Sequence, residues 1–470
     1  MKLKHFMSSL ALVVLAMTAL SVNAGNIDAN AAHRLAGQFI QQQASKGSFK
    51  AHAATDIKLI HAEASSAMAG ACDYYAFNLT GGGFVIIAGE DRAPQVLGYS
   101  DKGRLDFNNL PYNVKGLLDS YKREIEFLQT YKGDDLVPVN KNLTATAGGV
   151  DPLIKTTWGQ EDPYDWQCPV YQGQYCAVGC VATAMAQVMK YWQYPEGSSS
   201  LSSYYCNKIR QTVSALPATT FDYSLLLNSY CHWDYDNSQL VQDTYTDAQA
   251  QEVAKLSRYC GQAVQMSYHP DGSGAYTSDQ RNAMVSFGYR SSAKYVQKSS
   301  SSGWGWGSSG YTTAEWEALM KTELDAGRPI LFAASDTGGD GGHAFICDGY
   351  SSDGTFHFNF GWYGTCDGWY VSTALNMTHR SGDYLRYNTG QEMVIGIEPP
   401  EGWEPPVTFL LGDVNGDGAV NIADVTKLID YLLDDTTAIN LDAADVKGDG
   451  VVNIADVTAL IDLLLDISAE

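Results

Sequence analysis

The sequence is poor in basic residues: its 470 residues include 30 Lys and Arg against 53 Asp and Glu, a formal net charge of −23. Proteins that bind nucleic acid usually carry clustered Lys and Arg, which neutralise phosphates. The charge balance therefore argues against a nucleic-acid partner. Charged residues of both signs make up only 18% of the chain and hydrophobic residues 45%, so the composition predicts packed cores rather than disorder.

Long hydrophobic runs are also missing from the sequence. The most apolar stretch, Leu10–Leu20, is shorter than the ~20 residues that a membrane-spanning helix needs. It follows two lysines and precedes Val22-Asn23-Ala24, which has the small residues of a signal-peptide cleavage site. We therefore expect a signal peptide over residues 1–24, no transmembrane segment, and a protein that is secreted, periplasmic or held at the cell surface.

Among the nine cysteines only Cys176 and Cys180 have the C-x2–4-C spacing that is typical of a zinc knuckle, and no second such pair follows, which argues against a zinc site. Most of them are expected to be small buried residues. Because an odd number cannot all pair in an exported protein, at least one thiol is expected to stay free and is a candidate for reactivity.

Changes of composition divide the rest of the chain into four regions, and its length already requires more than one domain. The first is predicted to be a small α+β unit with helices near 31–46 and 114–131 and strands at 74–79 and 84–88. It ends in a polar segment of small residues, where proteolytic nicking concentrates. The four regions are 25–147, a large block over 148–398, a Pro-rich linker over 399–406, and an acidic tail over 407–470.

The segment that follows Gly179 predicts a buried helix that begins at a cysteine. Val181, Met185 and Val188 recur at helical spacing and form one apolar face. Cys180 would then lie at the helix N-terminus, where free backbone amides and the positive end of the helix dipole lower the pKa of a thiol. A structural cysteine that happens to precede a helix is the alternative that this segment leaves open.

A thiolate that attacks an amide needs a base nearby, and His343 has the most suggestive context. It follows a glycine-rich approach and begins a predicted strand over 343–348. A Ser-Ser-Asp-Gly turn leads into a second predicted strand over 355–360, so we expect a hairpin. Because side chains alternate along a strand, His357 and Asn359 are expected on one face and Phe356, Phe358 and Phe360 on the other. Asn359 is predicted to orient the His343 imidazole, and His357 to be a packed or surface residue.

The tetrahedral intermediate also needs hydrogen-bond donors for its oxyanion. The amide of Cys180 is one candidate. The side chain of Gln160 is a second, because the Trp158–Tyr164 segment precedes the nucleophile at a spacing that a loop can bridge.

These residues resemble the streptopain family of papain-like cysteine proteases. The resemblance rests on Gly179–Ala184, on Gly342-His343-Ala344-Phe345, on the Gln160 segment and on residues 84–99, which are similar to the family's pro-segment. It implies a papain-like α+β fold, endopeptidase activity on protein or peptide substrates, and removal of a pro-segment near residues 140–150. It also implies a substrate cleft lined by Gly342, Ser273, Gly274 and Trp362.

The sequence departs from the family after the histidine strand. The family often reads Asn-Trp-Gly-Trp-Gly-Gly there, whereas this chain reads Asn359-Phe-Gly-Trp-Tyr-Gly364. Phe360 keeps an aromatic ring but loses an indole N–H. The substitution leaves Cys180 and His343 unaffected.

The acidic tail contains a repeat with a period of 32 residues, which begins at Asp413 and again at Asp445. Each copy spaces oxygen ligands as a calcium-binding loop does and runs into a predicted helix, 425–433 or 457–465. Lys447 replaces one ligand of the second loop, which predicts weaker calcium binding there. The predicted ligands are Asp413, Asn415, Asp417, the Ala419 carbonyl, Asn421 and Asp424, then Asp445, Asp449, the Val451 carbonyl, Asn453 and Asp456.

The duplicated loop and helix resemble type I dockerin domains, which implies an all-α calcium-binding domain and a cohesin-like protein partner. The pairs Ile422-Ala423 and Ile454-Ala455 occupy the family's partner-reading positions, where small hydroxyl residues are frequent. An acidic helix pair without metal is the alternative for the tail.

We therefore expect an exported zymogen with a pro-domain, a papain-like endopeptidase domain and a dockerin-like domain. Catalysis itself requires no cofactor in this hypothesis, and Ca²⁺ is expected only in the tail. Two alternatives stay open: a papain-like amidase acting on cell-wall peptides, and a non-catalytic calcium-dependent adhesion or scaffold protein.

Overall fold

The computed structural model places most of the chain. It describes residues 25–45, 49, 56–132, 136–138, 149–234, 237, 239–298, 311–335, 342–374, 377–379, 391–404, 410–433, 437, 439–447 and 451–467. The predicted signal peptide, residues 139–148 of the expected maturation segment and residues 336–341 of the glycine-rich approach to His343 lie outside these ranges.

A sheet of ten antiparallel strands connects the N-terminal region with the large central block. Its first four strands come from the N-terminal region, and β4 pairs with β18 of the central block through Tyr99 opposite Trp369. The order across the sheet is β1 (Ile57–Ala64), β2 (Cys72–Leu79), β3 (Phe84–Ala88), β4 (Val96–Ser100), β18 (Gly368–Tyr370), β17 (Phe356–Asn359), β16 (Gly342–Tyr350), β15 (Ile330–Ser335), β20 (Gln391–Ile395) and β14 (Lys294–Gln297).

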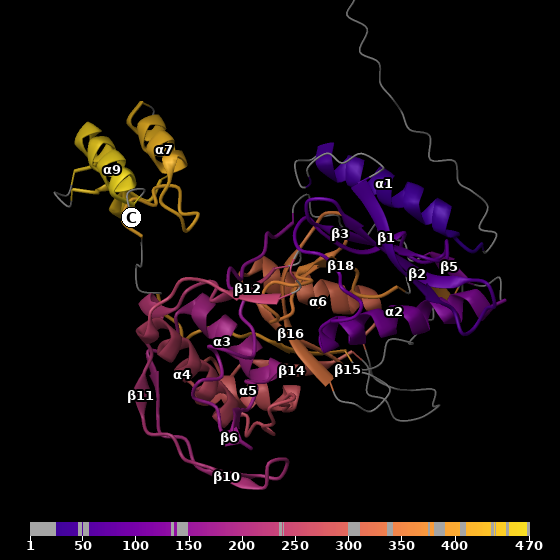
Figure 1. The fold of residues 1–470 in the computed structure, drawn as a ribbon, viewed down its shortest axis with the longest axis horizontal. Coiled ribbons are helices and arrows are strands. Elements are labelled where there is room, and N and C mark those ends of the chain that lie inside the picture. Colours follow the sequence, from indigo (N-terminus) through magenta and orange to yellow (C-terminus); the bar gives the residue numbers. More distant parts are fainter. Residues whose placement is uncertain are drawn as a thin grey trace, which may run out of the picture.

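In the N-terminal region, strands β1 and β2 lie between α1 (Ala29–Ser45) and α2 (Tyr112–Thr130), as Figure 1 shows. The alternation of β2 explains why both faces are covered: Tyr75 and Phe77 pack toward α1, while Tyr74 and Ala76 pack toward α2. The two predicted helices and two predicted strands of this region are confirmed to within a few residues, whereas β1 and β4 were not predicted.

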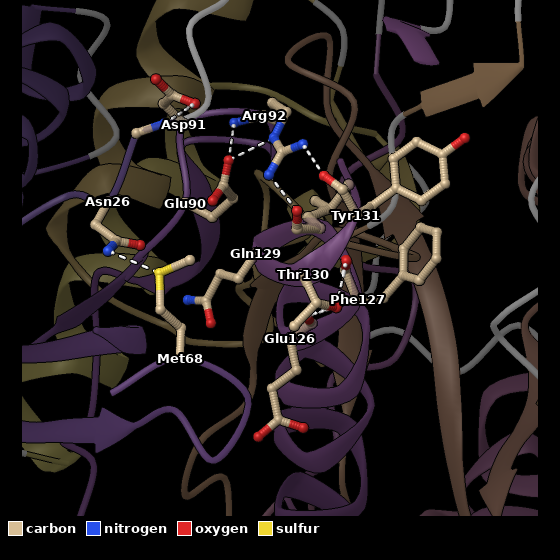
Figure 2. A network of polar contacts seen from close by, with 12 residues as sticks. Asn26, Met68, Glu90, Asp91, Arg92, Glu126, Phe127, Gln129, Thr130 and Tyr131 are labelled. Carbon is tan, nitrogen blue, oxygen red and sulfur yellow. Dashed lines mark hydrogen bonds and ion pairs between the residues drawn. The ribbon is translucent and has the colours of Figure 1, made fainter. Parts of the chain in front are cut away.

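The C-terminal end of α2 is fixed by a buried arginine (Figure 2). Arg92 forms an ion pair of 2.7 Å with Glu90 after β3, and it donates to the carbonyls of Leu128 and Tyr131. The last carbonyls of a helix have no partner within the helix. The arginine therefore satisfies them while joining α2 to the sheet.

In the central block, the two faces of the sheet carry different helices. One face packs on α3 (Cys180–Trp192), α4 (Asp247–Ala263) and α5 (Thr277–Ser286). The other packs on α6 (Thr313–Asp325), and its core cluster continues into α2 of the N-terminal region. The sheet and this shared core therefore make one packed body of the two regions.

Short ladders and one 3-10 turn complete the two regions. The turn is η2 (Tyr223–Leu225). The ladders pair β5 (Leu136–Pro138) with β19 (Met377–His379), β6 (Val170–Tyr171) with β7 (Gln174–Tyr175), β8 (Gly197–Ser198) with β11 (Thr219–Thr220), β9 (Tyr204–Cys206) with β10 (Gln211–Val213), and β12 (Cys231–Asp234) with β13 (Gln239–Gln242).

The acidic tail forms its own small core. Helices α7 (Ile422–Leu433) and α9 (Ile454–Ile467) pack on each other through Val425, Leu428 and Leu460, with the short α8 (Leu441–Ala444) beside them. Both predicted helices of the repeat are confirmed. Within the described part of the chain, no helix is long and apolar enough to cross a membrane.

Candidate active site

Cys180 is the first residue of α3, as predicted. Gly179 precedes it with a φ of 88°, and a Cβ at that position would meet the side chain of Met266 at 2.8 Å. Residues 181–189 are all buried, so the helix is surrounded by the core rather than apolar on one face only. This close packing fixes the position of the thiol.

The pKa of Cys180 differs from the expectation. Burial raises the pKa of the thiol, and the backbone N–H groups of Ala344, Val181 and Cys180 oppose that rise only in part. The helix start does supply donors to the sulfur, but the loss of solvent outweighs them.

Strand β16 begins beside the thiol. The N–H of Ala344 donates to Sγ of Cys180 at 3.4 Å, so His343 is one residue away from that contact. The predicted hairpin is confirmed, since β16 pairs with β17 in antiparallel register with Ile346 opposite Asn359. Gly342 lies at the start of β16, opposite Ser335.

The imidazole of His343 stacks on a tyrosine of the N-terminal region. Its ring centroid lies 5.7 Å from that of Tyr112, with 12° between the planes. Side chains alternate between the two faces of β16. Ala344 and Ile346 pack on the face that α3 covers, whereas His343 and Phe345 lie on the opposite face, which α2 covers. No local pattern in the sequence points to Tyr112.

Helix α2 is bound to the central block by buried polar side chains. Asn113 donates to the carbonyl of Phe360 at 2.6 Å, Tyr121 donates to the carbonyl of Val371, and the Glu124 carboxylate accepts from the N–H of Ala374. Buried polar groups stabilise only where they are paired. These bonds therefore make the contact specific as well as apolar.

Gln160 is buried, and its carbonyl accepts from the N–H of Val178 at 2.9 Å. The loop that carries it thus lies against the segment that leads to Cys180. The carbonyl of Ser273 lies 3.1 Å from where a Cβ of Gly179 would stand, so the Ser273–Gly274 loop borders the same place. Trp362 is half-buried against the core shared with α2.

Asn359 is buried in a network that joins β17 to α3. Its Nδ2 donates to the carbonyl of Thr156 at 2.7 Å, and its Oδ1 accepts from Nε2 of Gln187 at 3.1 Å. Gln187 was not predicted to matter, although a glutamine inside an apolar helix was a detectable signal. The orienting role of Asn359 stays a prediction.

His357 is packed, as expected, but it also belongs to an ion pair. Its Nδ1 lies 2.7 Å from Oδ1 of the fully buried Asp348. Burial lowers the pKa of His357, but the Asp348 carboxylate outweighs burial and raises it overall. Burial also raises the pKa of the nearby Asp367 to about 7.

Of the nine cysteines, seven are buried, and only Cys72 and Cys180 are partly exposed. The expectation that most are small buried residues is confirmed. All nine are free thiols in the structure.

The first repeat of the tail wraps its backbone around two buried carboxylates. Asp413 accepts from the N–H groups of Asp417 and Gly418, and Asp424 accepts from those of Asn415 and Asn421. In the second repeat Asp456 repeats this role, with the N–H groups of Lys447 and Asn453 as donors. Asp449 lies outside the described residues.

A cysteine at the start of a buried helix, beside a sheet strand that carries a histidine, is the arrangement expected of a papain-like cysteine protease. Residues 158–370 match the model of the Peptidase C10 family. Residues 24–125 match the Spi protease inhibitor model, and residues 411–465 match the dockerin type I domain. The protein is therefore a cysteine endopeptidase with an inhibitor-like pro-domain and a dockerin domain.

Two curated relatives and one solved structure are similar to most of this chain. Streptopain of Streptococcus pyogenes is 29% identical over 392 residues, which are 77% of this chain and 89% of streptopain. The thiol protease/hemagglutinin PrtT of Porphyromonas gingivalis is 32% identical over 343 residues, 69% of this chain, but the match spans only 37% of PrtT. A solved fragment of Prevotella intermedia prointerpain A aligns with a TM-score of 0.57 and 28% identity, over 73% of this chain and 99% of the fragment.

Proposed function

We propose that the protein is a secreted zymogen that hydrolyses peptide bonds through Cys180 and His343. The thiolate attacks the substrate carbonyl, and the amide of Cys180 with the side chain of Gln160 binds the oxyanion. Protonated His343 gives its proton to the leaving amine, and an acyl-enzyme remains. His343 then takes a proton from the water that releases the acid.

The observation that carries this proposal is the 3.4 Å hydrogen bond from the N–H of Ala344 to Sγ of Cys180. It joins two segments 164 residues apart in the sequence and brings the start of the histidine strand to the nucleophile. The Ser273–Gly274 loop, Gly342 and Trp362 are proposed to line the substrate cleft around it, and Asn359 to orient the imidazole.

Residues 25–147 are proposed to keep the precursor latent. The stack of Tyr112 on His343 supports this role, because a base that is held on the α2 side is not available to a thiol on the α3 side. Cleavage near residues 140–150 would release α2 and free the imidazole. The pKa of Cys180, raised by burial, fits the same latent state.

Hydrolysis of casein by the secreted protein tests the proposal, and a thiol alkylator should abolish it. Release of cell-wall fragments without casein hydrolysis would favour the amidase. Unchanged proteolysis and self-processing in Cys180→Ala would favour the non-catalytic scaffold. Mass spectrometry of the same samples reports the processed N-terminus, including loss of the predicted signal peptide over 1–24.

The first loop of the tail is proposed to bind Ca²⁺ more tightly than the second. Buried Asp413 and Asp424 offer carboxylate oxygens, and Asn415, Asp417, Asn421 and the Ala419 carbonyl have the spacing of further oxygen ligands. Within the described ranges no cluster of three or more His, Cys, Asp or Glu forms a metal site.

The tail is also proposed to bind a cohesin-like partner. Ile422 and Ile454, which are 71% and 69% exposed, occupy the same position in the two repeats. Large exposed apolar patches mark protein interaction sites, and the same two helices also expose Leu433 and Leu465. Binding of purified cohesin modules to the full chain, with Ile422→Asp and Ile454→Asp as variants, tests the proposal, which fails if the double variant binds as well as the natural chain.

A further inference from the structure

We propose that Tyr363 is a positioning residue that holds the Gln160 loop, residues 158–161, in place for oxyanion binding. The inference rests on the proposed role of Gln160. It concerns a residue at which this chain has a tyrosine in place of the glycine that the related motif often has.

Tyr363 is hydrogen-bonded to the Gln160 loop on both sides of Gln160. Its backbone N–H donates to the carbonyl of Trp158 at 3.4 Å. Its hydroxyl accepts from the N–H of Glu161 at 3.3 Å and donates to Oε2 of the same residue at 3.5 Å. One residue thus holds the loop two residues before and one residue after the proposed oxyanion donor.

The ring of Tyr363 lies directly on the backbone of Gly159. A Cβ at Gly159 would stand 2.0 Å from Cε1 of the ring, which is closer than any real contact. Tyr363 and Gly159 are therefore a matched pair, and the ring fills the space that the glycine leaves. Burial also raises the pKa of Tyr363, so its hydroxyl stays protonated and can donate to Glu161.

The backbone at Tyr363 is in the left-handed region, with a φ of 57°. This conformation is unfavourable for a bulky L-residue, so the surrounding contacts must stabilise it. Gly361 and Gly364 flank it with positive φ, and a Cβ on either would lie 3.2 Å from Thr183 of α3 or from Thr157. The turn therefore fits tightly between the helix that carries Cys180 and the Gln160 loop.

The other side of the loop is fixed to the nucleophile segment, since the carbonyl of Gln160 accepts from the N–H of Val178 at 2.9 Å. The backbone of Gln160 is thus held between Val178 and Tyr363. Donors that are fixed before the reaction stabilise the oxyanion without reorganisation. Loss of the Tyr363 hydroxyl should loosen the Gln160 loop without moving Cys180.

A double-mutant cycle on the full chain, allowed to mature, tests this inference. Gln160→Ala should lower kcat about 100-fold, the usual effect of removing an oxyanion donor. Tyr363→Phe should lower kcat about three- to tenfold with KM nearly unchanged, and have almost no effect when Gln160 is already alanine. Tyr289→Phe is the matched control, because this buried tyrosine of the same core donates to the carbonyl of Tyr194 at 2.6 Å.

Alkylation of Cys180 by iodoacetamide separates positioning from general disruption, because alkylation forms no oxyanion. Its rate should be the same in Tyr363→Phe and in the natural chain, and the titrated thiol normalises the hydrolysis rates. If Tyr363→Phe lowers kcat equally in the natural chain and in Gln160→Ala, or if it slows alkylation, the inference about Tyr363 fails. The oxyanion role of Gln160 would be unaffected by either result. If Gln160→Ala has the same kcat as the natural chain, Gln160 has no oxyanion role, and the inference about Tyr363 fails with it.

Discussion

The two proposed catalytic residues are held in opposite ways. Cys180 is fixed by the protease domain itself, through the close packing of Gly179 and the buried helix α3. His343 begins a strand of the same domain, but its ring is in contact with Tyr112 of the pro-domain. The nucleophile therefore depends on the core of the mature enzyme, and the base depends on what covers the other face of the sheet.

This difference suggests that maturation acts on the base and not on the nucleophile. Helix α2 approaches the sheet from the side of Phe345, and its buried polar side chains bind the backbone at Phe360, Val371 and Ala374. Removal of α2 would expose that face and leave the surroundings of α3 unchanged. Substitutions at Cys180 and at Tyr112 test the nucleophile and the base separately.

The largest effect is expected from Cys180→Ala, which removes the nucleophile. Loss of a catalytic nucleophile typically costs on the order of 10⁴- to 10⁶-fold in kcat, so casein hydrolysis and self-processing should both stop. Cys72→Ala is the matched control, since Cys72 is the only other partly exposed cysteine of the chain. An alkylated peptide that contains Cys72 instead of Cys180 would contradict the assignment.

On the side of the base, Tyr112→Ala should speed self-processing. An aromatic pair contributes about 0.5–1.5 kcal/mol beyond its buried area, which corresponds to roughly two- to twelvefold in rate. Thr130→Ala, an exposed change at the other end of α2, should process at the natural rate. Time courses of precursor cleavage measure both variants, and equal rates for the two would mean that the ring does not restrain His343.

The pro-domain itself should lose stability as pH rises. Burial raises the pKa of Asp73 in β2 to about 6, with repulsion from Glu126 adding to it. The native state then binds more protons than the unfolded state between about pH 4 and pH 6, so this contribution to stability is lost as pH rises through that window. Asp73→Asn should raise the free energy of unfolding of the pro-domain by roughly 1–3 kcal/mol at pH 7 and change it little at pH 4.

Thermal unfolding of the precursor at the two pH values measures this effect. Because a more stable pro-domain holds the base longer, Asp73→Asn should also slow processing at pH 7. A melting temperature for the variant that is lower at pH 7 than that of the natural chain would contradict the argument.

The smallest effect on catalysis is expected from calcium. Chelation should lower the melting temperature of the C-terminal module and leave kcat/KM on short peptides unchanged. Lys447→Asn should tighten the second loop about tenfold, because it adds an oxygen ligand and removes a positive charge. Calorimetric titration of the full chain measures the affinities, with Lys427→Asn as the control. Equal affinities of the two loops in the natural chain would refute the predicted difference.

Much of the secondary structure around the candidate site could be predicted because its signals are local. The helix of Cys180, the hairpin of His343 and the duplicated calcium loops are each visible within about 20 residues of sequence. Strand β4 is an element that local patterns in the sequence do not predict. A Cβ at Gly98 would lie 2.4 Å from the ring of Tyr370, so a glycine inside a strand is explained only by a residue 272 positions away.

The same reason explains the other differences. The pKa of Cys180 follows from burial in the folded precursor, which outweighs the local helix start. The contacts of Tyr112 with His343 and of Tyr363 with the Gln160 loop join segments that the sequence separates by some 200 residues. Local patterns predict elements and motifs, but they do not predict which distant side chains restrain them.

The shared ten-stranded sheet has a consequence for the order of folding. During synthesis N-terminal segments leave the ribosome first and generally fold first, so β1–β4 and α2 are available before β14–β20 are made. The edge of β4 can then serve as a template on which β18 pairs. Once the leading segment has been cut away, an unfolded mature chain lacks this template. We therefore expect the mature enzyme to refold more slowly than the precursor.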